Sequence, residues 1–358
     1  MISFLVRRLI AILATLLVVT LILYGIAMLT PLEDRAMLYF PKTDKNLSPQ
    51  ETQAILNRII HERGLDQSFP VQYGRWLAGV AQGNWGYSPT LHEDVLDALI
   101  TSTPPSAELM LYSLLLLIPL GIASGVHAAG RQGRWEDAAF RLGALVATAL
   151  PPFILGIVLL SIFYVGLYWF PIGRLGEAEM RLVSSTAFHS YTGLVTVDGL
   201  LNGRPDITLE ALRHLVLPVF TLSLVHWATL ARITRATAIE ELDKPYILAA
   251  RSRGNSQRRV LWRHTLGNVL IPALNSSALS AASLVTGLFI IEVVFLYNGL
   301  SSLFTQAMHI SAMGANPDVP LALGFSIYSV IAILILMTCL DILQAVLDPR
   351  LRGEEVLL

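Results

Sequence analysis

The residue types that carry nucleotide or covalent chemistry do not form a recognisable motif in this sequence. The only lysines are Lys42, Lys45 and Lys244, and none follows a glycine, so a Walker A phosphate loop is absent. The spacings of serine hydrolases, zincins and paired-cysteine metal sites are absent too, and the single cysteine, Cys339, cannot form an intrachain disulfide. We therefore expect no catalytic residue, cofactor or metal ion in this chain.

A few titratable residues could bind an ion or carry a proton. His92, Glu93 and Asp94 are consecutive, and we interpret them as solvated loop surface rather than a metal site. His226 lies inside an apolar run, where a titratable group is a functional candidate; the alternative is a neutral imidazole hydrogen-bonded to a neighbouring helix. Glu292 and Asp341 lie near the ends of apolar runs, so we expect structural roles in contact with water or a helix terminus.

Small and polar residues recur along one apolar run. Ser276, Ser280, Ser283 and Gly287 are separated by four, three and four residues, which places them on one face of a helix. In a membrane such a face favours close packing of helices. Alternatively it lines a polar path for a solute, and both roles can coexist at a subunit interface. The three serines, with His226, are the candidate pathway residues.

The apolar runs that hold these residues are typical of a membrane protein. The chain is 54% hydrophobic and only 14% charged. A helix needs about 20 apolar residues to cross the hydrocarbon core. We predict six such spans, and the fourth is the weakest because it is short and contains His214 and Pro218. The spans are residues 9–30, 107–129, 142–170, 214–231, 268–296 and 320–347.

The distribution of basic residues predicts the orientation of the spans. Most of the Lys and Arg residues fall on one side if both termini are cytoplasmic, and the short outer segment 297–319 then contains none. The first run follows Arg7 and Arg8 but is too long for a signal peptide and has no cleavage site, so we interpret it as a retained span.

Two outer segments are long. In residues 31–106, Ser48, Pro49 and Glu51 predict a capping box that starts a short amphipathic helix, and Gly64 predicts its end. Residues 171–213 are rich in glycine and polar residues, which is typical of a loop.

A basic island lies between the fourth and fifth spans. From Arg232 to Arg263 it has eight basic residues and three acidic ones, which a topology signal and attraction to anionic lipid would explain in part. The order Gly254-Asn255-Ser256 predicts a turn, and Ser256 predicts the N-cap of a second helix near Gln257. Two short helices with a tight turn would form a rigid protrusion that fits a groove on another protein.

This island resembles the cytoplasmic EAA loop of ABC-importer permeases, whose core is E-A-A-x-x-x-G. Leu248 replaces the Glu, while Ala249, Ala250 and Gly254 keep the register. Further segments are similar to the dipeptide/oligopeptide/nickel permease family, and in particular to its B-type subunit: FLVRRL, LDQSFPVQYGRWLAG, GNWGYS, ALPPF, HLVLPVFTLSL, LARITRA, EVVF and LDPRLR. The sequence departs from the family in the Pro-Gly-Asp turn (Pro31-Leu32-Glu33-Asp34), in Pro-Gly-Leu-Gly (Asn298-Gly299-Leu300-Ser301) and at a common Tyr (Gln344).

The resemblance implies an all-α, six-helix membrane protein with the type I ABC importer permease fold. It would consist of the first helix (1–30), the external segment (31–106), a permease core (107–350) with the coupling loop 232–267, and a cytoplasmic tail (351–358). The resemblance also implies that the docking contact for the ATPases comprises Tyr246, Ala249, Ala250, Arg251, Arg253, Gly254, Arg258 and Arg259.

The family also implies partners and a location. A second homologous permease would complete the translocation pathway as a heterodimer, two ATPase subunits would bind ATP and Mg, and an extracytoplasmic binding protein would deliver the solute. The complex would lie in the cytoplasmic (inner) membrane of a bacterium or archaeon, in contact with lipid and without nucleic acid. Di- and oligopeptides are the expected solutes, ahead of nickel chelates, glutathione-like peptides and small glycans. The alternatives are an autonomous secondary transporter or channel, and a non-transporting scaffold.

Overall fold

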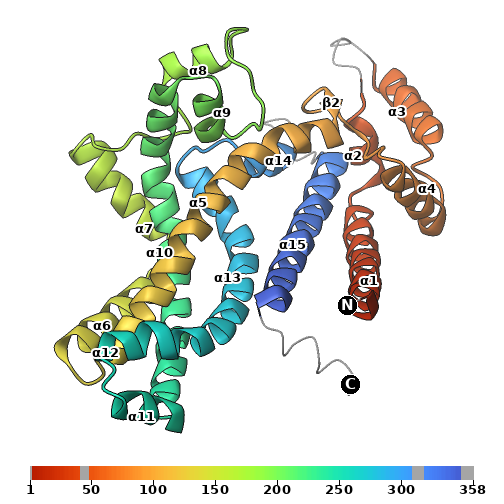
Figure 1. The fold of residues 1–358 in the computed structure, drawn as a ribbon. Helices are drawn as coiled ribbons and strands as arrows, with labels where there is room; N and C mark the ends of the chain where they lie inside the picture. The colour runs from red at the N-terminus through yellow and green to blue at the C-terminus, as the bar shows by residue number, and fades with distance from the viewer. Residues whose placement is uncertain (1, 41–47, 309–317, 348–358) are drawn as a thin grey trace. The chain divides into compact units, whose positions relative to one another are not determined.

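The structure is a computed structural model that describes residues 2–40, 48–308 and 318–347 (Figure 1). Within these ranges the regular secondary structure is helical, apart from one small β-hairpin. It divides into two compact units, Met1–Thr103 with Gly299–Ala332, and Pro104–Asn298 with Ile333–Leu358.

The first unit is built from one whole long helix, parts of two others, several short helices and a hairpin. In chain order these are α1 (Ile2–Ala27), α2 (Leu32–Met37), α3 (Pro49–Arg63), α4 (Phe69–Ala81), β1 (Tyr87–Ser88), β2 (Glu93–Asp94), the start of α5 (Val95–Gly130), α14 (Leu300–Ala307) and most of α15 (Val319–Leu347). The strands are antiparallel, with Tyr87 opposite Asp94.

The predicted capping box of α3 is confirmed. The Ser48 hydroxyl accepts a hydrogen bond from the Glu51 backbone N–H, and the Glu51 carboxylate accepts one from the Ser48 N–H at 2.8 Å. Pro49 occupies the first turn, and Gly64 ends the helix in the left-handed region at φ +61°. The amphipathic face packs on α2, where Leu56 and Ile60 join Ala36 in a small buried cluster.

Asp318 ties the hairpin of the first unit to α15. Its carboxylate is fully buried and accepts hydrogen bonds from the Ser88 hydroxyl at 2.6 Å and from the Thr90 N–H at 3.1 Å. It also accepts one from the Leu321 N–H at 3.1 Å, inside the first turn of α15. A single carboxylate thus both caps the helix and anchors the loop between β1 and β2.

The second unit contains the remaining helices. They are α6 (Trp135–Ala149), α7 (Pro152–Leu159) with the π-helix η1 (Leu160–Gly166), α8 (Glu177–Val183), α9 (Val195–Leu201), α10 (Pro205–Leu242), α11 (Pro245–Ser252), α12 (Gln257–Arg259) with the π-helix η2 (Val260–Thr265), and α13 (Leu266–Val294). The rest of α5 also belongs to this unit.

The third predicted span, residues 142–170, is wrong as a single continuous helix. The chain instead forms α6 and the α7–η1 helix, which meet at an angle of 100°. Pro151 and Pro152 lie at the break, where the first has extended backbone and the second begins α7. Proline lacks the N–H for the helical ladder and forces the preceding residue out of the α region, so the pair turns the chain.

The second outer segment is more ordered than the predicted loop. Residues 171–213 contain α8, α9 and the first turns of α10. The helix that contains the fourth predicted span is therefore much longer than residues 214–231, because α10 has 38 residues and continues through Pro218. A helix of that length is about 57 Å long, which exceeds the thickness of a bilayer.

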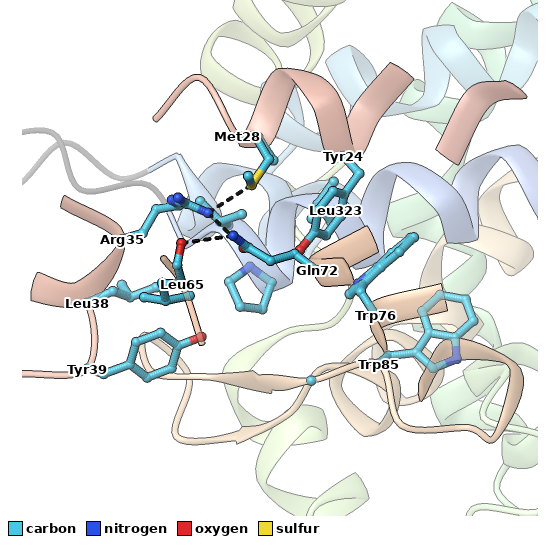
Figure 2. A pocket seen from close by; sticks show the side chains of 14 residues that line it. Tyr24, Met28, Arg35, Leu38, Tyr39, Leu65, Gln72, Trp76, Trp85 and Leu323 are labelled. Carbon is cyan, nitrogen blue, oxygen red and sulfur yellow. Dashed lines mark hydrogen bonds between the residues drawn. The ribbon is translucent and has the colours of Figure 1, made fainter. Parts of the chain in front are cut away.

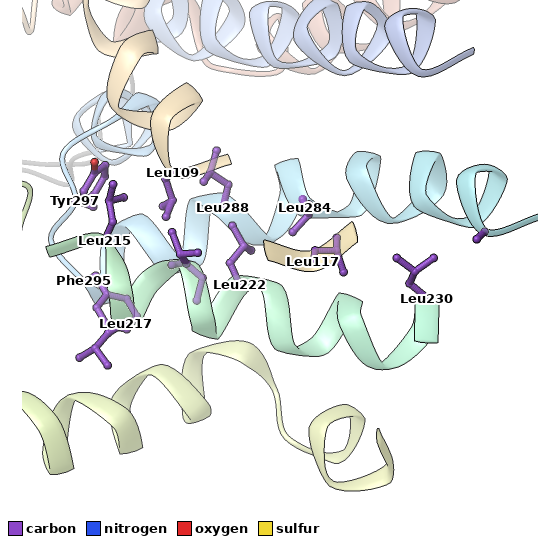
Figure 3. Close-up of a cluster of buried hydrophobic side chains, with 13 residues drawn as sticks. Leu109, Leu117, Leu215, Leu217, Leu222, Leu230, Leu284, Leu288, Phe295 and Tyr297 are labelled. Carbon is purple, nitrogen blue, oxygen red and sulfur yellow. The ribbon is translucent and has the colours of Figure 1, made fainter. Parts of the chain in front are cut away.

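The core of the second unit lies between α5, α10 and α13 (Figure 3). Leu109 and Leu117 of α5, Leu222 of α10 and Leu284 of α13 are all at most 1% exposed. Glycine lets α5 approach α10 closely, because a Cβ atom at Gly125 would lie only 2.6 Å from the Ala231 carbonyl oxygen. Small residues therefore set the spacing of these helices, as is common in membranes.

The predicted number of six spans is not confirmed. Within the described residues, four helices are long and apolar enough to cross a membrane, or five if the bent α6–α7 pair is one span. They are the apolar parts of α1, α5, α10 and α15, and α13 adds a shorter apolar stretch, Ser283–Val294.

Candidate coupling surface and buried polar groups

The basic island folds as the predicted pair of short helices. α11 begins at Pro245, after Lys244 in extended conformation, and ends before Gly254, whose φ of +78° lies in the left-handed region that glycine adopts without strain. The Asn255 amide donates to the Ala250 carbonyl at 2.9 Å and so closes the end of α11. The predicted N-cap is also confirmed, because the Ser256 hydroxyl accepts from the Arg259 N–H at 3.4 Å.

A hydrogen-bonded cluster holds α11 against the neighbouring long helices. The Tyr246 hydroxyl donates to the Glu241 carboxylate near the end of α10. The Asn268 amide, at the start of α13, donates to the Tyr246 oxygen at 2.7 Å and to the Glu241 carboxylate at 3.3 Å. Partial burial and the bond to Glu241 raise the pKa of Tyr246. The cluster thus ties α10, α11 and α13 together.

The two faces of α11 differ in exposure. Ile247 and Ala250 are buried within the chain itself, so the Ala250 side chain, which the resemblance implied in docking, faces inward. Ala249 and Gly254 are exposed, and nothing lies within 4 Å of a Cβ position at Gly254. Leu248, the residue in place of the family's Glu, is 66% exposed. The free surface of α11 therefore has small or apolar residues at its centre, with arginines around them.

The predicted docking arginines fall into two groups. Arg251 and Arg258 line a cavity of about 910 Å³, which we call the basic groove. Arg253 and Arg259 are exposed but do not line it. The other lining residues come from the end of α5, from the turn between α5 and α6, from α12 and from η2: His127, Gly130, Arg131, Arg134, Gln257, Leu261 and Trp262.

The candidate pathway residues lie in different environments. Ser280 is 5% exposed whereas Ser283 is exposed, and the side chain of Ser276 is outside the described residues. Gly287 packs against α10, because a Cβ atom there would lie 3.2 Å from Leu222 and 3.9 Å from the His226 ring. His226 is half-buried, and no hydrogen bond joins its ring to another described residue, so both roles considered for it stay predictions.

The sequence interpretation missed a buried carboxylate, Glu108. Its side chain is fully buried in α5 and accepts hydrogen bonds from the Thr196 hydroxyl and N–H at 2.7 and 2.8 Å. Arg174 pairs with it at 3.0 Å, and the Tyr297 hydroxyl donates to it at 3.2 Å. Burial, and then the charge of Glu108, raise the pKa of Tyr297. The network joins α5, α9 and the segments around Arg174 and Tyr297.

A second buried ion pair joins α6 to α10. The Arg235 guanidinium donates to both Asp137 carboxylate oxygens, at 2.6 and 2.9 Å, and the Gly133 N–H donates to the same carboxylate at 3.2 Å. Asp137 is 1% exposed. Removing one partner of such a pair leaves a buried charge, at a cost of about 3–5 kcal/mol.

The remaining acidic candidates can also be placed. Glu292 is 2% exposed and accepts a hydrogen bond from the Ser106 hydroxyl, which fits the expected structural role but not contact with water. The Asp341 side chain is outside the described residues. His92 lies at the hairpin turn with φ +61°, and no group of three or more His, Cys, Asp or Glu residues in the described ranges could hold a metal ion.

The first unit contains a smaller cavity of about 210 Å³ that no sequence pattern indicated (Figure 2). Arg35 reaches it and donates to the Gln72 amide oxygen at 3.5 Å, while the Gln72 amide donates to the Leu65 and Gln67 carbonyls. Its aromatic walls come from segments far apart in the chain, which explains why the sequence did not reveal it. They are Tyr24, Tyr39, Trp76 and Trp85.

Comparison with known proteins covers nearly the whole chain. Residues 118–353 match the family described as binding-protein-dependent transport system inner membrane component, and residues 1–106 match its N-terminal family. The chain is 30% identical to the di/tripeptide transport system permease protein DppB of Pseudomonas aeruginosa, over 99% of this chain and 100% of that protein.

Two further relatives show the same pattern. The probable D,D-dipeptide transport system permease protein DdpB of Escherichia coli is 31% identical, over 84% of this chain and 85% of its own length. The oligopeptide transport system permease protein AppB of Bacillus subtilis is 27% identical, over 98% of this chain and 99% of its own. With the apolar helices, these matches confirm the resemblance: the chain is a multi-pass inner-membrane protein that belongs to the permeases of binding-protein-dependent ABC importers, with their type I fold.

Proposed function

We propose that this chain forms half of the translocation pathway of an ATP-driven importer of peptides. The relatives named above are permeases for di/tripeptides, D,D-dipeptides and oligopeptides, which supports a peptide cargo. A second, homologous permease would form the other half as a heterodimer. An extracytoplasmic binding protein would deliver the cargo, and two ATPase subunits would bind ATP and Mg.

The attachment of α11 is the observation that carries the coupling part of this proposal. Tyr246, Glu241 and Asn268 bond α11 to the ends of both α10 and α13, so a force applied to α11 reaches two long helices at once. Because packed helices move as rigid bodies, a nucleotide-driven shift of the ATPases would tilt these helices between inward-open and outward-open states. This function places both termini, and the coupling loop, on the cytoplasmic side.

The exposed side of α13 is the proposed contribution to the pathway. Ser283 is exposed, and His226 of α10 lies beside Gly287 on the same stretch of α13. Hydroxyl groups and an imidazole offer hydrogen bonds to the backbone of a peptide without binding it tightly. In this arrangement, Ser280 serves packing because it is buried.

The ion pairs of the second unit disfavour an autonomous, ion-coupled transporter. Such a transporter needs a carboxylate within the membrane that exchanges a proton or a cation. Glu108 and Asp137 are instead bound by Arg174 and Arg235, and each accepts further hydrogen bonds from backbone N–H groups. These contacts occupy both carboxylates within the fold, which favours a structural role for each over the exchange of a proton or a cation.

The substitution Gly254→Trp tests the docking role of α11. We expect the protein to insert normally but to lose co-purification of the ATPase subunits and uptake of a labelled dipeptide, because the exposed turn becomes too bulky to enter a groove. Gly254→Asn is the control: asparagine tolerates a positive φ, so it separates the bulk of the side chain from backbone strain.

Each outcome bears on one part of the proposal. Unchanged ATPase co-purification with Gly254→Trp would refute docking through α11. Equal loss with Trp and Asn would show that any side chain at this position is excluded, which also supports close approach. The cargo is tested separately in proteoliposomes with the complete importer, and uptake competed by a nickel chelate or a glycan but not by peptides would refute the peptide assignment.

A further inference from the structure

The basic groove concentrates arginine side chains that have no acidic partner. Arg134, Arg251 and Arg258 form no ion pair within the described ranges of the chain. Arg131 approaches Glu136 at 3.6 Å, but both side chains are partly exposed and such a pair binds weakly. Like charges repel each other, so this arrangement is stabilised when an anion enters the groove.

The groove has an apolar base as well as a charged rim. Leu261 and Trp262 of η2 line it, and Trp262 is 41% exposed. The end of α5 packs directly on η2, because a Cβ atom at Gly130 would lie 2.4 Å from Leu261. This contact brings Arg131 and Arg134, which follow α5, to the same cavity as Arg251 and Arg258 of the coupling loop.

The position of the groove along α5 corresponds to the lipid headgroups. The apolar sequence of α5 ends at Val126, and Arg131 follows five residues later. Five residues of helix rise about 7–8 Å, and the headgroup layer of each leaflet is roughly 5–8 Å thick. Trp135, at the start of α6, is 77% exposed, and tryptophan is enriched at this depth of a bilayer.

We propose that the basic groove binds the phosphate headgroup of an anionic phospholipid from the cytoplasmic leaflet. Guanidinium groups bind phosphate oxygens through paired, charge-assisted hydrogen bonds, and Trp262 packs beside the glycerol or the first acyl carbons. The site rests on the cytoplasmic orientation of the coupling loop in the proposed function, but not on the peptide cargo. A bound lipid would link the α5–α6 turn to the coupling loop, so the lipid composition would set how firmly α11 is held.

An acidic segment of the ATPase is the competing occupant. The position of the groove relative to the bilayer favours lipid. Arg131 and Arg134 come from the turn between two membrane helices rather than from the exposed surface of α11. Arg253 and Arg259, which lie outside the groove, remain for contacts with the ATPase.

The experiment measures lipid retention by the purified full-length chain. Native mass spectrometry and thermal unfolding are recorded in nanodiscs of phosphatidylcholine with or without phosphatidylglycerol. The test variant is Arg131→Gln/Arg134→Gln. The matched control is Arg232→Gln/Arg263→Gln, which removes the same charge from exposed residues outside the groove.

We expect the wild type to retain phosphatidylglycerol and to unfold at a higher temperature when that lipid is present. The test variant should bind it about tenfold more weakly or worse, while the control keeps wild-type binding. Equal losses in both variants would overturn the proposal in favour of diffuse charge attraction.

Two further outcomes identify another ligand. Full displacement by glycerol phosphate or inorganic phosphate would show a site for a soluble anion and overturn the lipid assignment. Loss of ATPase co-purification by the test variant in pure phosphatidylcholine, without any change in lipid binding, would assign the groove to the ATPase.

Discussion

Tyr246 is the residue whose hydroxyl connects three helices. It donates to Glu241 of α10 and accepts from Asn268 of α13, although its own helix, α11, has only eight residues. A helix this short is not stable by itself, so its order depends on such tertiary contacts.

The substitution Tyr246→Phe should loosen α11 without unfolding the protein. A lost hydrogen bond of this kind costs about 0.5–1.5 kcal/mol, which corresponds to roughly a threefold to tenfold faster hydrogen exchange in α11. Transport per hydrolysed ATP should fall while the ATPase still binds. Tyr191→Phe is the control, because Tyr191 is exposed and its hydroxyl forms no hydrogen bond among the described residues. Unchanged exchange in α11 would show that packing, not this cluster, holds the helix.

Single residues with local partners could be predicted from the sequence, and residues with distant partners could not. Ser48 and Ser256 act as N-caps as predicted, because each bonds to a residue only three positions away. Glu108 bonds to Thr196, Arg174 and Tyr297, and no local pattern relates these positions. Its place at the edge of an apolar run therefore hid a fully buried charge.

At the scale of elements, the residue spacing in α13 does not by itself distinguish a packing role from a role in the pathway. The spacing of Ser280, Ser283 and Gly287 predicted one helix face with two possible roles. The structure separates the residues: Ser280 is buried, Gly287 packs against Leu222, and Ser283 is exposed.

Bulky substitutions should therefore have different effects on α13. Ser280→Leu inserts a large side chain into a packed site, so we expect lower thermal stability and poor assembly. Ser283→Leu should leave folding and ATPase binding intact and reduce peptide uptake. Fluorescence size-exclusion chromatography measures assembly, and proteoliposome uptake measures transport. A folded Ser283→Leu protein with wild-type uptake would remove this residue from the pathway.

The helices could be predicted where the length of an apolar run alone sets their bounds, but not where proline residues determine whether the chain bends. α1 covers the predicted first span up to Ala27, and α15 contains the predicted sixth span. Pro218 lies within α10 without ending it, whereas Pro151 and Pro152 produce a bend of 100°. Neighbouring helices can compensate for one missing N–H, but two consecutive prolines restrict the preceding residues as well.

At the scale of the whole molecule, the first unit combines the N-terminal segments with a distant stretch of the chain, Gly299–Ala332. Its core joins Val95 and Leu99 of α5 to Leu303 of α14 and Leu321 of α15. The sequence boundary between the outer segment and the core falls near residue 106, close to the end of the matched N-terminal family and inside the continuous helix α5. The grouping of α14 and α15 with the N-terminal segments depends on tertiary contacts, which composition and periodicity do not contain.

Lys244, the N-cap of α11, makes the orientation of the chain directly measurable. It is exposed, and the only other lysines, Lys42 and Lys45, belong to the segment that we assign to the outer side. A membrane-impermeant amine reagent applied to intact cells should label the tryptic fragments of Lys42 and Lys45 and leave Lys244 unmodified, and inside-out vesicles should give the reverse. Lys244→Arg is the control that identifies its fragment. Labelling of Lys244 from outside would invert the topology. In the proposed topology Lys244 is the only lysine on the cytoplasmic side, so its amine serves as a site-specific chemical handle on the coupling helix.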